Sequence, residues 1–499
     1  GAPGVIDIPG PLKQTLVVDK LNLNGIYIGA SERLTFDEID IVLASGSTLT
    51  VPDPIAHTFP LKRLTGSAKL DLQAGTAEIE NLTLDLNGPI FGVTANADGI
   101  NQGGDITVTA EAAIKDVPFD QLTTYWPVSM GGDAYTWVTT HLAKGQLTEA
   151  LANVEVRINK DGTHSLDKLE GTMSAEGVEV TYLEGMPPVN DVKGLTTFDA
   201  DTFNIVVESG QSNKINLTGA DIKITGLRNV DQFIDIDLHV ESPVSDALGL
   251  IDREPFGFAS AMKIDPKSTL GDSKIDLSLK FLLAKDLVVG DVDAKAKASL
   301  TNVSMEEVVL GRGIRNGELT LEVNTNTMAV DGNVLMGDVP VALIWNENFS
   351  DRAAFRSIYL LAARIDDLSQ VRALGVDLGP VGDFVSGGVD ATVRYTVFND
   401  RKSRVDVNAN LERAELRVPV MEWRKAAGDA GGVDATILLE NGLVKSVPEF
   451  NLSANDLLVQ GDVAYSPGGL GIDRLNLKQV LIGRSDVTGA VISRPDGGW

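Results

Sequence analysis

The stretch INLTGADIKITGL (215–227) alternates apolar and polar residues, and this alternation decides the fold. Strict period-two alternation predicts a β-strand with one apolar and one polar face. The pattern recurs in FIDIDLHV (233–240), KIDLSLKFLL (274–283), ELTLEV (318–323) and RLNLKQVLIG (474–483). Glycine, aspartate and asparagine interrupt the runs, which is typical of strands joined by tight antiparallel turns. The sequence therefore predicts a mainly β protein with roughly 35 to 40 strands.

Four short stretches favour helices instead. They are DQLTTYWP (120–127), DAYTWVTTHLAKG (133–145), SPVSDALGLIDR (242–253) and DDLSQVRALG (366–375). Ser242 before Pro243 suits a helix N-cap, and Gly145 and Gly375 are placed to end helices. Strands and helices do not alternate as they do in parallel α/β folds, which argues against a doubly wound parallel sheet.

The helical stretches divide the chain into approximate segments. We expect a first β-segment at 1–124, a helical insert at 125–146, a second β-segment at 147–255, a third at 256–375 and a C-terminal β-segment at 376–499. AAIKDV (112–117), ASLTNV (298–303) and ARIDDL (363–368) share a pattern of Ala, Ile or Leu, Asp or Asn, and Val or Leu. This recurrence indicates a loose internal repeat.

Composition limits the classes of partner. The 499 residues carry a formal net charge of −28, which argues against nucleic acid and against docking on anionic lipid headgroups. The chain has no cysteine, which excludes disulfides and thiolate chemistry and suits an oxidising compartment. No run of 18 apolar residues is present, so no membrane-spanning helix is expected within this sequence. Both ends read as cut, and we expect an anchor outside the sequence.

The apolar face is built almost entirely from Leu, Val and Ile, because aromatic residues make up only 5% of the chain. One solution is an elongated, twisted antiparallel sheet whose apolar face lines an open hydrophobic groove. The other is a closed core, in which the same residues pack against each other across a barrel or sandwich. Alternation alone leaves both open.

The sequence shows no catalytic constellation. The four histidines, His57, His141, His164 and His239, are too far apart to form a metalloprotease pair. No nucleophile elbow, phosphate-binding loop or dinucleotide fingerprint occurs. With 70 carboxylates, acidic pairs arise by chance and carry no weight. We therefore expect no enzyme, no catalytic residue, no metal and no cofactor.

One stretch, YWPVSMGGDAYTWVTTHLAKGQL (125–147), carries a resemblance to a known family. Its pattern resembles the core of the bacterial YhdP-type proteins within the AsmA-like group, through Tyr125, Trp126, Pro127, Trp137 and Gly145, together with Val138, Leu142 and Leu147. The family usually has an Arg shortly before the second Trp, whereas Ala134, Tyr135 and Thr136 stand there in this chain. Segments 176–194, 336–349, 413–431 and 481–499 resemble the family in the same order.

The resemblance implies a periplasmic β-groove, anchored to the inner membrane, that conducts phospholipid towards the outer membrane through a receiving partner of unknown identity. Its acyl chains would slide along the apolar phase of the clearest strands. The candidate lining residues are Phe203, Ile205, Ile215, Leu217, Ile222, Ile224, Ile234, Ile236, Leu238, Ile275, Leu277 and Leu279. The five motif residues are expected to be structural. Two rivals stay open, a closed structural or adhesive β-repeat without lipid and a polysaccharide-acting enzyme, although the five scattered Trp count against the latter.

Overall fold

The computed structural model describes residues 4–8, 14–53, 55–101, 103–284, 287–309, 311–374, 382, 384–419, 422–466 and 471–493. The chain forms two compact units. The first unit comprises Gly1–Val240 and Leu279–Asp291, and the second comprises Glu241–Ser278 and Val292–Trp499. Each unit is described by itself.

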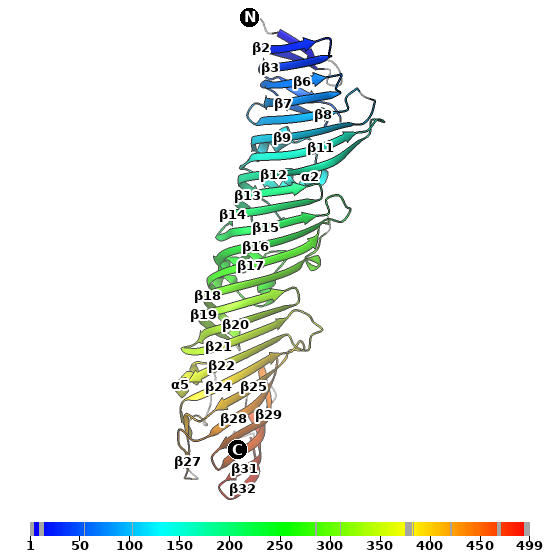
Figure 1. Cartoon of the computed structure of the whole chain (residues 1–499). Coiled ribbons are helices and arrows are strands. Elements are labelled where there is room, and N and C mark those ends of the chain that lie inside the picture. The colour runs from blue at the N-terminus through cyan, green and yellow to red at the C-terminus, as the bar shows by residue number, and fades with distance from the viewer. Residues whose placement is uncertain are drawn as a thin grey trace. The chain divides into compact units, whose positions relative to one another are not determined.

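The first unit is an antiparallel meander in which each strand pairs with the next one in the chain (Figure 1). Its strands are β1 (Gly4–Ile8), β2 (Gln14–Ile28), β3 (Arg33–Leu43), β6 (Arg63–Asp71), β7 (Thr76–Asp85), β8 (Ile90–Asp98), β9 (Ile106–Pro118), β11 (Gln146–Ile158), β12 (His164–Val180), β13 (Val189–Asp199), β14 (Thr202–Ser212) and β15 (Ile215–Thr225).

Two inserts interrupt this meander without breaking it. The hairpin of β4 (Thr48–Val51) and β5 (His57–Pro60) lies between β3 and β6. The helical insert lies between β9 and β11 and contains η1 (Phe119–Gln121), α1 (Leu122–Tyr125), α2 (Gly132–His141) and β10 (Leu142–Ala143). Strands β9 and β11 nevertheless pair along their whole length, from Gln146 opposite Pro118 to Ile158 opposite Ile106.

The second unit repeats the architecture. Its meander contains β18 (Asp293–Val309), β19 (Arg312–Asn324), β20 (Thr327–Met336), β21 (Val339–Asn348), β22 (Ser357–Ile365), β24 (Val389–Val397), β25 (Lys402–Asn410), β28 (Gly431–Glu440), β29 (Leu443–Ala454), β30 (Leu457–Tyr465), β31 (Ile472–Ile482) and β32 (Ser485–Ile492). Helix α5 (Leu368–Ala373) follows β22, and β23 (Val385–Gly387), β26 (Ala414–Val418) and β27 (Trp423–Lys425) form a small separate sheet.

The strands β16 (Phe233–Pro243) and β17 (Leu270–Leu282) each contribute residues to both units. Between them, in the second unit, lie α3 (Val244–Ile251), α4 (Phe258–Ala261) and η2 (Pro266–Ser268), while η3 (Val289–Asp291) follows β17 in the first unit. We call residues 244–268 the strap. Ser273 at the start of β17 donates its hydroxyl to the Ser242 carbonyl at 2.8 Å, which ties the two stems of the strap together.

These observations confirm the predicted fold class. The chain is mainly β, antiparallel and poor in helix, and no described pairing joins β1 to β15 or β18 to β32, so neither meander is closed into a barrel. The segment bounds expected from the sequence stay a prediction. Within the described residues, no helix is both long and apolar enough to span a bilayer.

Three details of the helix predictions were wrong. Ser242 does not cap α3, because its hydroxyl lies against that of Ser273 at 3.1 Å and the N-cap position is Pro243. Helix α2 ends at His141 rather than at Gly145, because Leu142 and Ala143 pair with Val180 and Glu179 of β12. The sequence also missed α4 and η2 in the strap. Gly375 lies outside the described residues.

All the inserts lie at one edge of their meander. Successive turns of a meander alternate between its two edges, so strands an even number of steps apart end at the same edge. In the first unit the β4–β5 hairpin follows β3 and the helical insert follows β9, four strands later. In the second unit the inserts follow β22 and β25, two strands apart. The strap joins this edge too, because Gly271 at the start of β17 lies against Thr301 and Val303, and the strand β18 continues from there to Val309 at the same edge as the end of β22. We call this edge the capped edge.

The repeat seen in the sequence corresponds to a local backbone device. Asp116 and Asn302 both adopt left-handed conformations, with φ of 58° and 53°, inside long strands. A left-handed residue inserted in a strand reverses which face the following side chains take. Val117 and Val303 therefore return to the apolar face, where they are buried to 1% and 0% exposure. In the third copy, Asp367 instead accepts the backbone N–H of Ser369 and begins α5.

Candidate functional site

A continuous row of apolar residues and glycines crosses the sheet of the first unit. Direct cross-strand partners connect it from β2 to β15 without a polar interruption. The row is Leu23, Ile39, Gly66, Leu82, Val93, Ala112, Ala152, Gly171, Phe198, Phe203 and Ile224. At about 4.8 Å between neighbouring strands, ten steps span roughly 48 Å.

The protein leaves much of this row uncovered. A second row lies beside it on β11–β15, formed by Ala150, Met173, Thr196, Ile205 and Ile222. Every residue of both rows on these five strands is half-buried rather than buried. We call these two rows on β11–β15 the bare strip. Apolar surface left against water costs about 25 cal/mol per Å², so the strip favours any hydrocarbon that covers it.

The structure places all twelve predicted lining residues in half-buried positions. It brings four of them together in the bare strip, where Phe203 faces Ile224 and Ile205 faces Ile222. Leu217 and Ile215 lie opposite Gly210 and Ser212. A Cβ on Gly210 would meet the side chains of both Val192 and Leu217, so these share a face. The remaining six, Ile234, Ile236, Leu238, Ile275, Leu277 and Leu279, lie on β16 and β17. Whether the twelve bind lipid stays a prediction.

In the bare strip, a glycine makes room for the aromatic ring that lies opposite it. Gly171 lies opposite Phe198, and a Cβ there would come within 2.4 Å of the phenyl ring and 2.3 Å of the Leu151 carbonyl oxygen. The ring therefore lies over the glycine instead of projecting from the sheet. The pairs Gly25 with Phe36 and Gly461 with Phe450 repeat this arrangement.

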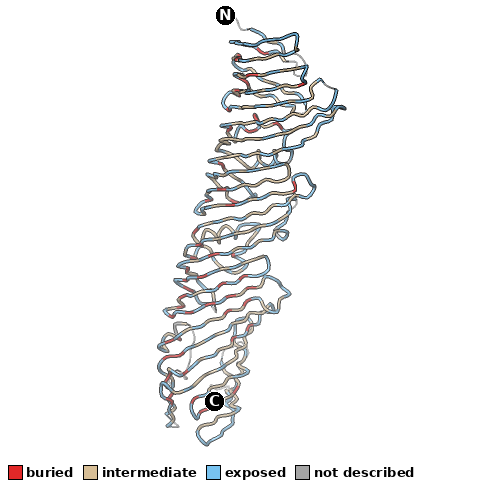
Figure 2. Tube along the Cα trace, in the orientation of Figure 1, coloured by how far each residue is buried: buried red, intermediate tan, exposed pale blue. Residues whose placement is uncertain are grey.

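The second unit has an equivalent row that runs from β18 to β32. It comprises Leu300, Leu319, Gly332, Leu343, Leu361, Val393, Val407, Ala435, Phe450, Gly461, Leu477 and Gly489. Across β19–β22, however, this face is buried, and Figure 2 shows its strands alternating between buried and exposed positions. Its main members, which we call the covered strip, are all 8% exposed or less: Leu319, Val330, Val334, Val341, Leu343, Trp345 and Tyr359.

Aromatic stacking reinforces the covered strip. Trp345 stacks on Tyr359 with ring centroids 5.4 Å apart, and Tyr359 stacks on Tyr395 at 5.8 Å. Trp345 donates its indole N–H to Glu347 at 3.0 Å, and Glu347 also accepts from Arg356 at 3.2 Å. Burial, together with the nearby Glu347 carboxylate, holds the pKa of Tyr359 well above its usual value.

The family motif residues lie in and next to the helical insert, and their structural role stays a prediction. Tyr125 is buried, and Trp126 packs on the same apolar cluster as Leu84 and Val117 of the sheet. The insert is tied to the β4–β5 hairpin, because His57 Nε2 lies 2.9 Å from the Thr124 carbonyl and Ser129 donates to the Ile55 carbonyl at 2.7 Å. Pro127 is buried, whereas Trp137 is 46% exposed and stacks on His141 with ring centroids 5.0 Å apart.

Gly145 completes the motif at the start of β11. It has φ of 57°, and a Cβ there would clash with the backbone of Glu176 and Gly177 at 2.4–2.5 Å. Only glycine fits this close approach of two strands.

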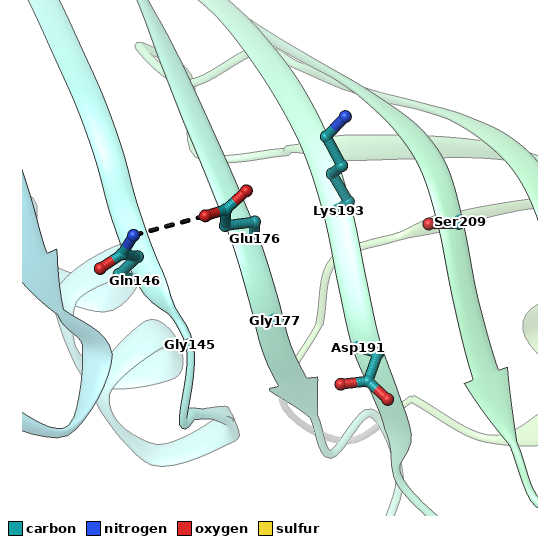
Figure 3. A pocket seen from close by; sticks show the side chains of 7 residues that line it. All are labelled: Gly145, Gln146, Glu176, Gly177, Asp191, Lys193 and Ser209. Atoms are coloured by element: carbon teal, nitrogen blue, oxygen red, sulfur yellow. Dashed lines mark hydrogen bonds between the residues drawn. The ribbon is translucent and has the colours of Figure 1, made fainter.

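Two hollows lie on the opposite, polar face. In the first unit, Gly145, Gln146, Glu176, Gly177, Asp191, Lys193 and Ser209 line a hollow of about 620 Å³ (Figure 3). Gln146 donates to Glu176 at 3.4 Å, and Lys193 pairs with Glu208 at 2.6 Å. None of the seven lining residues is a histidine, and Lys193, which lies opposite Ser209, pairs with Glu208 instead.

The hollow of the second unit, about 860 Å³, follows the cross-strand chain Asp331, Ile344, Leu360, Arg394, Asp406 and Thr436. Among the described residues, no group of three or more His, Asp or Glu side chains is arranged to hold a metal ion.

One buried charged residue, Lys425, stabilises the local fold. Lys425 on β27 has 0% exposure, and its ammonium donates to the carbonyls of Leu411, Ala414 and Ala426 at 2.9, 3.0 and 3.1 Å. Burial lowers its pKa, while the three carbonyls compensate for the lost water. This lysine fastens the small β23–β26–β27 sheet at the capped edge.

Sequence reasoning missed the part of the row on β2–β13. There the lining is mostly Ala, Gly and Val, and left-handed residues such as Asp116, Gly177 and Asp191 shift the alternation within a strand. The signal that would have found it is the dipeptide of Asp, Asn or Gly followed by Val, which marks each shift at 116–117, 177–178, 191–192 and 302–303.

Comparison with known families places these features in context. The model of the YhdP protein family matches residues 33–463. No curated protein matches the chain. The family match spans the apolar rows from β3 to β30, the helical insert and the strap, and it confirms the resemblance carried by the Trp126–Pro127 motif. The chain belongs to the YhdP family.

Proposed function

We propose that this protein is a non-enzymatic lipid-transfer conduit, which carries phospholipid between the inner and outer membranes through the periplasm. The observation that carries the proposal is the apolar row across β2–β15, whose bare strip remains half-exposed in the folded protein. Family membership supports the same class of function.

The chemistry of the row suits a cargo that moves. Each buried methylene of an acyl chain gains about 0.8 kcal/mol, and one strand offers much the same aliphatic surface as the next. A chain that shifts by one strand therefore exchanges similar contacts and meets no deep minimum. A polar headgroup would stay in water beside the sheet.

The acidic surface and the described side chains fit passive transfer. The net charge of −28 disfavours lasting adsorption to anionic membranes, so a conduit of this kind needs anchoring by other means. We propose that the full-length protein is anchored in the inner membrane and delivers its cargo to a receiver at the outer membrane.

A matched pair of substitutions on β14 tests this function. Ile205 belongs to the bare strip, whereas its neighbour Val206 is 47% exposed on the opposite face. Ile205→Asp should slow transfer of a fluorescent phospholipid between donor and acceptor vesicles about tenfold or more, because an unpaired carboxylate against an acyl chain costs more than about 1.4 kcal/mol. Val206→Asp should leave the rate unchanged.

The same pair of variants gives a binding readout. Phospholipid should be extracted from the purified wild-type chain and from Val206→Asp, and in reduced amount from Ile205→Asp. Equal transfer by two folded variants, or a wild-type chain without extractable lipid, refutes the proposal. In that case a structural or adhesive β-repeat without lipid cargo becomes the better hypothesis.

A further inference from the structure

The strap covers the apolar face of the second unit from edge to edge. It leaves the sheet at the capped edge, where β16 ends at Pro243, and returns there at β17. Arg356, however, ends the turn between β21 and β22, which lies at the opposite edge. Its guanidinium donates to the Ala261 carbonyl of α4 at 3.1 Å. A segment that starts at one edge and contacts the other must cross the face between them.

The strap side chains touch the covered strip through apolar contacts. Val244, Leu248, Met262 and Ile264 belong to the same packed cluster as Val341 and Leu343. These are the contacts that an acyl chain would make with Leu, Val and Ile. The strap therefore takes the place that hydrocarbon takes on an uncovered strip.

The strap contains hydrogen bonds between its own residues. Asp252 accepts both the backbone N–H and the hydroxyl of Ser260, at 2.6 and 2.7 Å. Asp265 accepts the backbone N–H of Lys267 at 3.0 Å and caps η2. These hydrogen bonds join residues within the strap, and Arg356 holds the α4 end of the strap through its bond to the Ala261 carbonyl.

We propose that the covered strip is a second acyl-chain site, closed by the strap, and that phospholipid enters it when the strap lifts from the sheet. The inference rests on the proposed function. It adds that lipid and strap compete for one surface, with Arg356 holding the closed state.

The absence of cysteine from the chain allows a clean test. In the tip-tied protein, Ala261→Cys and Arg356→Cys are joined by a short bismaleimide, which holds the strap on the sheet. In the stem-tied control, Ser242→Cys and Ser273→Cys are joined by a disulfide, which leaves the strap free. Both proteins, and the wild type, are loaded with a phospholipid that carries a photoreactive diazirine on one acyl chain, and labelled peptides are mapped by mass spectrometry.

We expect label at Ile205 and Ile222 of the bare strip in all three proteins. Label at Leu343 and Leu361 should appear in the wild type and the stem-tied control and be lost in the tip-tied protein. Equal labelling of Leu343 in tip-tied and stem-tied protein overturns the proposal, since the strap then excludes nothing. Absence of label there in every protein overturns it as well, since the strap is then a permanent part of the core.

The label at Ile205 and Ile222 distinguishes failure of the proposed function from failure of the strap proposal. Loss of label at Ile205 and Ile222 in all proteins defeats the proposed function itself, whereas intact label there with either negative result at Leu343 defeats only the strap proposal. Arg356→Ala needs no crosslinker and gives the opposite change. It should increase label at Leu343 several-fold and leave label at Ile222 unchanged.

Discussion

The bare strip and the covered strip are built from the same pattern but differ in what lies on them. Both are rows of cross-strand partners made mostly of apolar residues, with aromatic rings in each: Phe198 and Phe203 in the bare strip, Trp345 and Tyr359 in the covered strip. On β11–β15 these residues are half-buried, whereas on β19–β22 the strap and an aromatic stack reduce exposure to 8% or less. The comparison teaches that alternation fixes which face of a strand is apolar, and that the inserts decide whether this face becomes core or binding surface.

The largest expected difference is in stability. Leu343→Ala, at 1% exposure, should lower the free energy of unfolding by about 2–5 kcal/mol, because it leaves a cavity beneath the strap. Ile222→Ala in the bare strip should cost about 1 kcal/mol, because part of its surface is already wet. Urea unfolding of the lipid-free chain measures both values. Equal costs would mean that the bare strip is packed as tightly as the covered one.

A second contrast lies within the first unit, between Gly171 in the bare strip and Gly219 on β15. Gly171→Ala should destabilise the chain by about 1–3 kcal/mol, because the new methyl group meets the Leu151 carbonyl and pushes the Phe198 ring off the sheet. Gly219→Ala is the matched control, since its nearest heavy atom lies at an ordinary 3.6 Å. The Gly171 variant should also retain less lipid. If both variants unfold at the same urea concentration, the close approach at Gly171 has no energetic weight.

A third prediction concerns the contacts that hold the strap and the helical insert in place. Arg356→Ala removes the bond to Ala261 and one partner of the buried Glu347, which should cost about 1–3 kcal/mol. Hydrogen exchange should accelerate in the strap at 244–268 and stay unchanged in the helical insert at 119–143, which is held by His57 and Ser129 instead. Faster exchange throughout the chain would instead show general destabilisation.

The smallest effect is a dependence on alkaline pH. Burial raises the pKa of Tyr359 above its usual 10, so above that pH the unfolded chain releases this proton more readily than the folded one. The stability contributed by Tyr359 is complete below about pH 10 and falls as pH rises further. Tyr359→Phe should flatten this decline. Tyr125 of the first unit, whose pKa burial also raises, should leave a residual slope.

Much of this architecture was predictable because its signals are local. Alternation predicted the antiparallel, mainly β class. The stretches at 120–127, 242–253 and 366–375 contain α1, α3 and α5, and the stretch at 133–145 overlaps α2. The candidate site was predicted only where side chains are large, as at Phe203 and Ile222. The rows across β2–β13 escaped because left-handed residues such as Asp116 change which face the following side chains take, and simple alternation does not show this change.

The position of the strap over the covered strip could not be predicted from the sequence, and the reason is a different one. The strap is as apolar as a strand, and nothing local says that Ala261 will meet Arg356, which lies 95 positions further along the chain. Ser242 shows the same limit, since its hydroxyl had an attractive local role as a cap but bonds to Ser273 across the stem. Long-range partners overrode local preference at both places.

The placement of every insert at the capped edge also restricts how chains of this kind change length in evolution. Gain or loss of one strand would reverse all later strands and carry each later insert to the other edge. Gain or loss of a whole hairpin preserves the arrangement, and the spacings of four strands between the inserts after β3 and β9 and of two between those after β22 and β25 obey this rule. Relatives of different length should therefore differ by even numbers of strands between inserts, so that the chain grows in hairpin units.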